Sequence, residues 1–441
     1  MISIPFLIYL LVGPVAWVLT FIGTEMGRFK MKRLLKWRAK LPACPPKVTI
    51  LIPAKDEGEG IRRCLDAVLA QDYSNFDIVT IDDRSEDNTG AVMDEIATSD
   101  PRVRAIHIAR GALPAGWLGK CHALHAGVRS LPPIAGSVSR DTGVPPVLVA
   151  HETKVRQVSN APHTGEDARV TDTVSSIEAS DESWLFFVDS DVTLERAALS
   201  TAISICLQRE YDALSILTRI DCRSFIERLM LPPLAGAWAI MHSISKTNED
   251  SRKDRAYANG QFFLVRRRAY EAVGGHQTVK DQITEDVELM RALKSNDFIV
   301  RFFSGGHLAS TRMHTNLKQM FNGWGRIYSG TERRSPWRIL CTMWFILTSI
   351  FTVYPALVYG IYRLTSDGNV QWLEASSLHF ILMTVYLALI YHWSGNKPRY
   401  ALLVPFSSAI MLAIFAFSLR KCQTGQITWR ETIFQSKPNA D

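Results

Sequence analysis

The chain has 441 residues, of which 47% are hydrophobic and 21% are charged, and its formal net charge is +7. This composition excludes a disordered, collagen-like or coiled-coil protein and leaves room for one large or two modest domains. The seven cysteines lie far apart and form no Cys-x-x-Cys pair, which excludes a zinc ribbon and argues against a disulfide framework. We therefore expect the part of the chain that carries chemistry to lie in a reducing compartment.

The N-terminal end begins with an apolar run over residues 3–23, which carries no charge and is long enough to cross a bilayer as a helix. Basic residues follow this run instead of preceding it, which is typical of an uncleaved anchor and not of a signal peptide. The positive-inside rule places the following residues in the cytoplasm. The sequence predicts a transmembrane anchor over 1–25 and a basic juxtamembrane linker over 26–46.

Short apolar runs alternate with amphipathic segments in the middle of the chain. The predicted strands are 48–53, 76–81, 103–108 and 184–188, and the predicted helices between them are 58–71, 88–98 and 119–130. Such alternation is typical of an α/β domain with a mostly parallel sheet, in which ligands bind beyond the carboxyl ends of the strands. We expect this domain to span residues 47–335.

Two segments of the middle region do not fit this alternation. Residues 132–181 are rich in Ser, Thr, Val, Pro and Asp and show no sustained period, which predicts an inserted and largely disordered segment. The apolar stretch 225–244 is interrupted by charged residues and by the Pro232-Pro233 pair. We predict helices lying in the membrane interface here, with a buried core helix as the alternative.

The C-terminal end contains three further apolar runs, at 338–362, 377–393 and 400–419. They predict a transmembrane region of about three helices over 336–420, followed by a tail over 421–441. Three membrane spans would place the tail on the other side of the membrane from the α/β domain. The basic residues of the tail favour the cytoplasmic side instead. Either one apolar run is re-entrant, or the tail does not follow the positive-inside rule. We expect an integral protein of the cell inner membrane with a cytoplasmic α/β domain.

The strongest chemical motif follows the strand 184–188. Asp189 and Asp191 stand two residues apart just past the strand end, so both carboxylates can approach one divalent cation, and hard oxygen ligands favour Mg²⁺ or Mn²⁺. Such a cation would stabilise the charge on a leaving nucleoside diphosphate. We predict Asp191 as the direct metal ligand and Asp189 nearer the ribose or the metal, with a solvated turn as the alternative.

Polar residues at the other predicted strand ends would bind the rest of a nucleotide. Asp83 ends the second strand, where an acidic acceptor can take the N3–H of a uracil ring, and residues 53–57 follow the first strand. Gly119 and Lys120 open a helix, where amide groups and a cation suit phosphate, and Gly260 would let the backbone approach a sugar. A plain turn or helix start is the alternative for these groups. The donor-binding candidates are Pro53, Ala54, Lys55, Glu57, Asp83, Gly119, Lys120, Asp189 and Gly260.

The sequence Thr284-Glu285-Asp286 begins a predicted helix. A carboxylate in a first turn also interacts favourably with the helix dipole, which is the structural alternative. As a functional residue, Asp286 would be a general base that deprotonates an acceptor hydroxyl for in-line attack, with Glu285 as the rival. A polar segment before the C-terminal apolar runs could face the acceptor or the diphosphate through His314, Trp324 and Arg326.

These motifs, taken in chain order, resemble family 2 glycosyltransferases of the GT-A fold, a Rossmann-like α/β fold. Residues 114–127 (PAGWLGKCHALHAG) are similar to the membrane-bound branch that includes hopanoid- and carotenoid-associated glycosyltransferases. The resemblance covers residues 47–330 without the insertion and implies a nucleotide-sugar donor, taken as a UDP-sugar, a divalent metal and inversion at the anomeric centre. It assigns Asp83 to the uracil contact, Asp191 to the metal and Asp286 to the base.

One departure from this family bears on the product. The Gln-x-x-Arg-Trp signature of processive polysaccharide synthases is missing, and residues 322–326 (NGWGR) stand near its expected place. This favours single transfer, and we expect a membrane lipid as the acceptor. A polysaccharide synthase remains an alternative, as does a catalytically silent scaffold that binds partners through 132–181, although the intact acidic set argues against the scaffold. The basic run lacks interleaved aromatic residues, so we expect no nucleic-acid partner.

Overall fold

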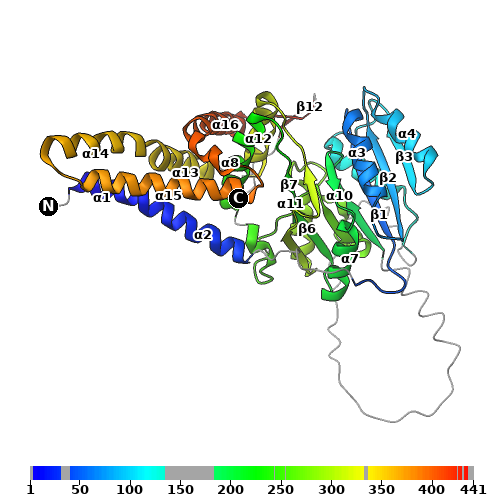
Figure 1. Cartoon of the computed structure of the whole chain (residues 1–441). Coiled ribbons are helices and arrows are strands. Elements are labelled where there is room, and N and C mark those ends of the chain that lie inside the picture. The colour runs from blue at the N-terminus through cyan, green and yellow to red at the C-terminus, as the bar shows by residue number, and fades with distance from the viewer. Residues whose placement is uncertain are drawn as a thin grey trace, which may run out of the picture.

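The computed structural model describes residues 3–30, 40–134, 183–242, 244–253, 255–331, 336–424, 426–429 and 432–435. An α/β domain lies at one end of the molecule, and a bundle of long helices extends away from it and carries the N-terminus at its far end (Figure 1). Residues 31–39 of the predicted basic linker, nearly all of the predicted insertion 132–181, and residues 425, 430–431 and 436–441 of the tail lie outside the described residues.

The α/β domain is built on a seven-stranded sheet in the order β3-β2-β1-β4-β8-β6-β9. Four neighbouring strands run parallel: β1 (Val48–Ala54), β2 (Phe76–Asp83), β3 (Val103–Ile108) and β4 (Trp184–Phe187). β8 (Phe263–Arg266) is antiparallel to both β4 and β6 (Ala213–Leu217), and β9 (Val300–Ser304) is parallel to β6. The sheet is therefore mostly parallel, as predicted, with one reversed strand in its middle.

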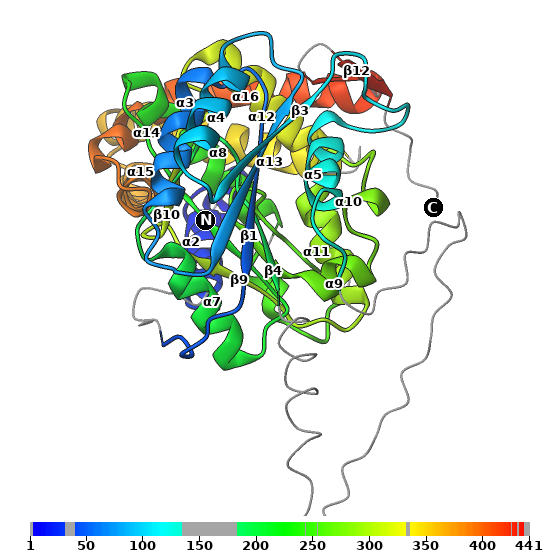
Figure 2. The ribbon, with the colours of Figure 1, turned by 90° about the vertical axis from the view of Figure 1, so that its right-hand side faces the viewer.

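Helices cover both faces of this sheet (Figure 2). One face carries α3 (Gly58–Leu69), α4 (Thr89–Ser99) and α7 (Ala198–Arg209). The other carries α5 (Gly119–Arg129), α9 (Arg267–Ala272), α10 (Gly275–Thr278) and α11 (Glu285–Ser295). Successive residues of β1 alternate between the two cores: Ile50 and Ile52 pack toward α3 and α7, and Leu51 packs toward α5 and α11. The inner strands β1, β4 and β8 are buried at every residue and are mostly apolar, which made them recognisable in the sequence.

The described residues include four helical segments that are long and apolar enough to cross a membrane: Ile4–Phe29, Trp337–Asp367, Gln371–Trp393 and Pro398–Cys422. The first comprises α1 (Ile4–Leu10), a π-helical turn (Leu11–Val15) and α2 (Ala16–Lys30). The others comprise α13 (Trp337–Ile346), a second π-helical turn (Leu347–Phe351), α14 (Val353–Asp367), α15 (Gln371–Trp393), a 3₁₀ helix (Pro398–Leu403) and α16 (Val404–Thr424). The expected N-terminal and C-terminal membrane helices are therefore present.

Polar contacts hold the N-terminal helices against the C-terminal ones. The hydroxyl of Tyr9 lies 2.9 Å from Nδ1 of the fully buried His379, and Nε1 of Trp17 donates to the carbonyl of Ser349 at 2.8 Å. Gly13 makes room for the imidazole, because a Cβ there would lie 2.6 Å from Nδ1 of His379. Hydrogen bonds between helices in an apolar bundle fix how the helices pack. The N-terminal segment is thus docked along the bundle.

The stretch predicted as interfacial helices forms one helix, α8 (Phe225–His242), which corrects the expectation of several. Its first turn is a capping box: the Glu227 carboxylate accepts the N–H of Ser224 at 2.9 Å, and the Ser224 hydroxyl accepts the N–H of Glu227 at 3.2 Å. This cap explains a charge within an apolar stretch. The buried side of α8 packs against α12 (Leu317–Thr331), α15 and α16. This packing agrees with the alternative prediction of a buried helix. Its depth relative to a membrane surface stays a prediction.

The remaining elements connect the α/β domain to the bundle. A 3₁₀ helix (Ile244–Asn248) follows α8, and a three-stranded sheet is formed by β5 (Val192–Leu194), β10 (Ala309–Thr311) and β7 (Arg219–Ile220). α16 packs along α12 and α8, at the end of the bundle next to the α/β domain (Figure 1). After it, β11 (Gln426–Trp429) and β12 (Thr432–Gln435) pair as an antiparallel hairpin.

Candidate active site

The carboxyl ends of β1, β2 and β4 open onto one large cavity, about 2320 Å³, between the α/β domain and the membrane helices. These parallel strands end at the same edge of the sheet, so the loops that follow them converge there. Nearly all predicted site residues line this cavity: Pro53, Ala54, Lys55, Glu57, Asp83, Lys120, Asp189, Asp191, Gly260, Glu285, Asp286, His314, Trp324 and Arg326. Gly119 is the exception and lies behind Asp83.

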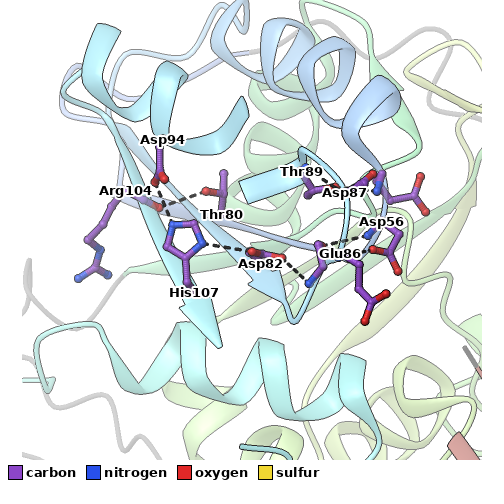
Figure 3. Close-up of polar contacts among 11 residues, drawn as sticks. Asp56, Thr80, Asp82, Glu86, Asp87, Thr89, Asp94, Arg104 and His107 are labelled. Carbon is purple, nitrogen blue, oxygen red and sulfur yellow. Dashed lines mark hydrogen bonds and ion pairs between the residues drawn. The ribbon is translucent and has the colours of Figure 1, made fainter. Parts of the chain in front are cut away.

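The loops that follow β1 and β2 are tied to each other (Figure 3). Asp56 has a φ of 53°, its carboxylate accepts the N–H of Glu86 at 2.7 Å, and its own N–H donates to the Ser85 hydroxyl at 3.0 Å. The Asp87 carboxylate accepts the N–H of Gly58 at 2.9 Å, at the start of α3. A non-glycine residue in the left-handed region is strained, so these bonds hold the two loops in a fixed relation beside the cavity.

Asp83 is held by its neighbour in the chain. Arg84, with a φ of 63°, donates Nε and Nη2 to the two carboxylate oxygens of Asp83 at 2.8 and 3.0 Å. Gly119 faces this pair, because a Cβ there would lie 2.5 Å from Oδ2 of Asp83 and 2.6 Å from Nη2 of Arg84. The glycine therefore allows α5 to approach the ion pair closely. The predicted contacts of Asp83 and Gly119 with a donor stay predictions.

His107 of β3 supports this strand end from the side (Figure 3). Its Nδ1 lies 3.2 Å from Oδ2 of Asp82, and its Nε2 lies 2.9 Å from Oδ1 of Asp94. Oδ1 of Asp82 in turn accepts the N–H of Ser85 at 3.0 Å. The hydrogen bond to Asp94, and then the one to Asp82, raise the pKa of His107 above its ordinary value.

We expect His107→Gln to destabilise the protein in a pH-dependent way. Because the folded pKa of His107 exceeds the unfolded one, protonated His107 stabilises the fold below about pH 6.5, and this contribution is lost as pH rises through the folded pKa. The Tm difference from wild type should be larger at pH 5.5 than at pH 8.5, and small because the side chain is exposed. Arg104→Gln, on the same strand but bonded to Ser130, is the control. A Tm difference between His107→Gln and wild type that is the same at both pH values would contradict this prediction.

The turn Asp189-Ser190-Asp191 lies one residue after the end of β4 and directly before β5. β5 pairs with β10, where Thr311 lies opposite Val192, the residue after Asp191. Oδ1 of Asp191 is buried and has no hydrogen-bond partner among the residues that the structure describes. Burial, followed by the negative charges of Asp189 and Glu57, raises the pKa of Asp191 to about 7. A buried carboxylate oxygen without a partner is a feature of ligand and metal sites.

These residues fit the predicted divalent cation. Asp189 and Asp191 supply hard oxygen atoms, and the unpartnered Oδ1 of Asp191 is one of them. Within the described part of the chain, no group of three or more His, Cys, Asp or Glu side chains is arranged to hold a metal. Asp189 and Asp191 would hold the ion, and bound diphosphate and water would complete its coordination.

Lys120, at the start of α5, links the turn after β4 to α11. Its Nζ lies 2.7 Å from Oδ1 of Asp189 and 2.8 Å from Oε1 of Glu285. Burial alone would lower the pKa of Lys120, but the carboxylates of Asp189, Glu285 and Asp286 raise it well above its ordinary value. The ammonium group is therefore charged and bound to carboxylates. The predicted contact of Lys120 with phosphate stays a prediction.

Asp286 lies in the first turn of α11 and faces Gly260. Its Oδ2 accepts the N–H of Gly260 at 2.6 Å, and its Oδ1 accepts the N–H of Val287 at 2.8 Å. Burial, followed by the charge of Glu285, raises the pKa of Asp286 to about 7. A Cβ at Gly260 would lie 2.9 Å from Nζ of Lys120, so the glycine permits the close approach of these groups. A carboxylate with a pKa near 7 is suited to accept a proton at neutral pH.

The opposite wall of the cavity is formed by α12 and the segment before it. His314 has a φ of 55°, and its ring lies against Gly323. Burial, followed by the positive charge of Arg326, lowers the pKa of His314 to about 4, so the imidazole is neutral at pH 7. Nε1 of Trp324 is buried without a hydrogen-bond partner in the described residues. This wall therefore offers a neutral imidazole, an indole N–H and a guanidinium to a ligand.

Comparison with known proteins identifies the family. The profile described as glycosyltransferase like family 2 matches residues 45–329, about two thirds of the chain. The chain belongs to this family. Glycosyltransferase GlyG of Streptococcus pneumoniae is 33% identical over 60 residues, which cover 14% of this chain and 20% of that protein. The uncharacterized glycosyltransferase EpsJ of Bacillus subtilis is 34% identical over 68 residues, which cover 15% and 20%. The chain thus matches about a fifth of the length of these relatives.

Two solved structures superpose on the chain with low scores and low sequence identity. Mannosyltransferase PcManGT from Pyrobaculum calidifontis, in complex with GDP-Man and Mn²⁺, superposes with a TM-score of 0.46 and 13% identity over 94% of this chain and 99% of that chain. S. aureus TarS 1-349 in complex with UDP-GlcNAc superposes with a TM-score of 0.37 and 11% identity over 89% and 97%. The family membership and the mostly parallel sheet confirm the predicted α/β GT-A fold of this family 2 glycosyltransferase. The narrower resemblance to hopanoid- and carotenoid-associated enzymes stays a prediction.

Sequence reasoning missed part of the wall of this cavity. The lining includes residues of α2, namely Leu19, Thr20, Gly23, Thr24, Met26, Gly27 and Arg28, and residues of α15, namely Ile390, His392 and Trp393. The only signal in the sequence was the occurrence of small and polar residues at helical spacing within an apolar anchor. A hydrogen-bond network after β6 was also missed, in which Oε1 of Gln261 accepts a hydrogen bond from the Thr218 hydroxyl at 2.5 Å.

Proposed function

We propose that this family 2 glycosyltransferase transfers a sugar from a nucleotide sugar, taken to be a UDP-sugar, to a hydroxyl group of a membrane lipid, with inversion at the anomeric carbon. The main support is the placement of the Asp286 carboxylate and the Asp189-Ser190-Asp191 turn in one cavity. The same cavity is lined by helices that are apolar enough to cross a membrane. A base, a site for a leaving diphosphate and access from lipid are the three requirements of this reaction.

The residues of the chain would share the chemistry as follows. Asp286 takes the proton of the acceptor hydroxyl while the oxygen bonds to the anomeric carbon, and the bond from that carbon to the diphosphate oxygen breaks. One displacement of this kind inverts the configuration. A divalent cation held by Asp191 and Asp189 would offset the negative charge of the leaving nucleoside diphosphate. Lys120 keeps Asp189 and Glu285 in place, and Asp83 accepts the N3–H of the uracil.

The membrane placement is also part of the proposal. Four helical segments of the described chain are apolar enough to cross a membrane. The basic residues that follow the N-terminal anchor favour a cytoplasmic position for the α/β domain, which corresponds to the inner membrane of a cell. Nucleotide sugars would then reach the cavity from the cytoplasm, and the acceptor would reach it from the lipid.

The proposal is tested with detergent-purified protein, a panel of UDP-sugars, a native lipid extract and Mg²⁺ or Mn²⁺. We expect one UDP-sugar to release UDP in a lipid-dependent way that a chelator abolishes, and the lipid product to carry one added sugar. A long polymer as the product would instead support a polysaccharide synthase. If the protein neither binds nor cleaves any UDP-sugar, the proposed donor is wrong, and the same panel with other nucleotide sugars identifies it.

A further inference from the structure

The cavity that contains Asp286 continues between α2, α8 and α15, of which α2 and α15 belong to segments that are apolar enough to cross a membrane. α15 packs against both α2 and α8, so the three helices form a trough. Small residues from two of them form part of its lining: Gly23, Gly27, Ala235 and Ala239. Where side chains are this small, the helix backbones themselves form the wall and leave room for a ligand.

The trough opens sideways between α2 and α8. Leu19 and Met26 of α2 are 62% and 58% exposed, Ile240 of α8 is 48% exposed, and all three line the cavity. A side chain that is exposed and also lines a cavity marks the rim of an opening. Leu19 and Met26 belong to a segment that is apolar enough to cross a membrane, and in a bilayer such an apolar rim faces lipid chains and not water. The opening therefore suits an acyl or prenyl chain.

The inner end of the N-terminal anchor has a fixed position in this trough. The hydroxyl of Thr24 lies 2.9 Å from that of Tyr386 on α15. The guanidinium carbon of Arg28 lies 3.6 Å from the ring centroid of Trp393, and its Nη1 lies 2.6 Å from Oε1 of Glu25. Together with the hydrogen bonds at the other end of the anchor, these contacts make α2 a built wall of the cavity and not only a tether.

The charges that line the cavity are segregated. The carboxylates among the described lining residues all belong to the α/β domain: Glu57, Asp83, Asp189, Asp191, Glu285 and Asp286. The part of the lining that α2, α8 and α15 provide contains no acidic side chain. A neutral or anionic head group beside α2 would thus meet no like charge, while its hydroxyl could reach the carboxylates across the cavity.

We propose that the N-terminal anchor is a substrate-binding element of this enzyme. The acceptor is a hydroxyl-bearing lipid that lies in the trough between α2, α8 and α15. Its apolar chain passes through the opening at Leu19, Met26 and Ile240, and its head group points toward Asp286. This inference rests on the proposed function and deepens it, because it gives the acceptor a defined site on this chain.

Gly23 allows a selective test. Gly23 lines the cavity, and a Cβ added there would meet no protein atom within 4 Å. A larger side chain would therefore occupy space in the cavity without clashing with the protein, and it would compete only with a ligand. Leucine is also a better helix former than glycine, so the substitution favours the helix. We expect Gly23→Leu to raise the KM for the acceptor lipid at least tenfold, with Gly23→Ala between wild type and Gly23→Leu. Lipid-independent hydrolysis of the UDP-sugar and the affinity for donor should remain at wild-type levels.

Ile22→Phe is the matched control, because Ile22 is the neighbouring residue, is exposed and does not belong to the cavity lining. It should keep the wild-type KM. A wild-type KM for Gly23→Leu overturns the inference, as does an equal loss of donor hydrolysis and lipid transfer. If wild-type protein binds and hydrolyses the donor but glycosylates no lipid in the extract, the proposed acceptor class itself is wrong, and the two failures are therefore distinguishable.

Discussion

Replacing Asp286 by asparagine is expected to lower kcat for sugar transfer by about 10²–10⁴-fold, the usual contribution of a general base, while the affinity for the nucleotide sugar is unchanged. Asparagine has the same shape, and its amide oxygen can still accept the N–H that Gly260 donates to Asp286 at 2.6 Å. It cannot take a proton from the acceptor hydroxyl. Single-turnover transfer and calorimetric donor binding measure the two quantities separately. Transfer within a few-fold of wild type would remove Asp286 from the role of base.

The pH dependence gives this assignment a second readout. Burial and the charge of Glu285 raise the pKa of Asp286 to about 7, and only the ionised form accepts a proton. We expect kcat/KM to fall below pH 7 and to level off above it. Glu285→Gln removes the negative neighbour, so it should retain transfer and shift this limb to lower pH. If Glu285→Gln abolishes transfer and Asp286→Asn does not, the two residues exchange roles.

The strands that carry the site could be predicted because their environment is uniform. β1 is buried on both faces and ends in a polar loop, so the run 48–53 marks its course to within one residue of the structure. The reversed direction of β8 could not be predicted, because a buried strand has the same composition whether it runs parallel or antiparallel to its neighbours. The sequence predicted several helices at 225–244 because charged residues and the Pro232-Pro233 pair were taken as interruptions. In the structure the carboxylate of Glu227 caps α8, and the helix continues through both prolines.

The site residues that stand at the ends of strands could be predicted from the sequence. The contacts that depend on packing between distant segments could not. Tyr9 and His379 are 370 residues apart in the sequence, and nothing local to either one indicates that they meet. The place of Lys120 at a helix start followed from the sequence. Its contacts with Asp189 and Glu285 depend on how α5 and α11 are placed on the sheet. The contribution of the N-terminal anchor to the cavity has the same origin.

Asp191→Asn is expected to lower transfer by about 10³-fold and to weaken Mn²⁺ binding in the presence of UDP. Charge stabilisation by a divalent ion is worth several kcal/mol, and each 1.4 kcal/mol is about tenfold in rate. Among the described residues, Asp189 and Asp191 are the two that we assign to this ion, so the loss of one carboxylate should not be compensated. Electron paramagnetic resonance of Mn²⁺ measures binding without turnover. Asp94→Asn, an exposed acid outside the cavity lining, is the control and should bind Mn²⁺ as wild type does.

The same substitution should stabilise the metal-free protein. Burial and the charge of Asp189 raise the pKa of Asp191 to about 7, above its ordinary value near 4. The folded state therefore binds the proton more tightly than the unfolded state does, so ionised Asp191 destabilises the fold at pH 8, and this destabilisation disappears as pH falls below about 4. Asparagine keeps the size and removes the charge. In EDTA, the Tm of Asp191→Asn should exceed that of wild type at pH 8, and the difference should shrink toward pH 5. If Asp191 instead stabilised the fold, its replacement would lower the Tm. A Tm of Asp191→Asn below that of wild type, together with lost transfer, would therefore make Asp191 a structural residue and not a metal ligand.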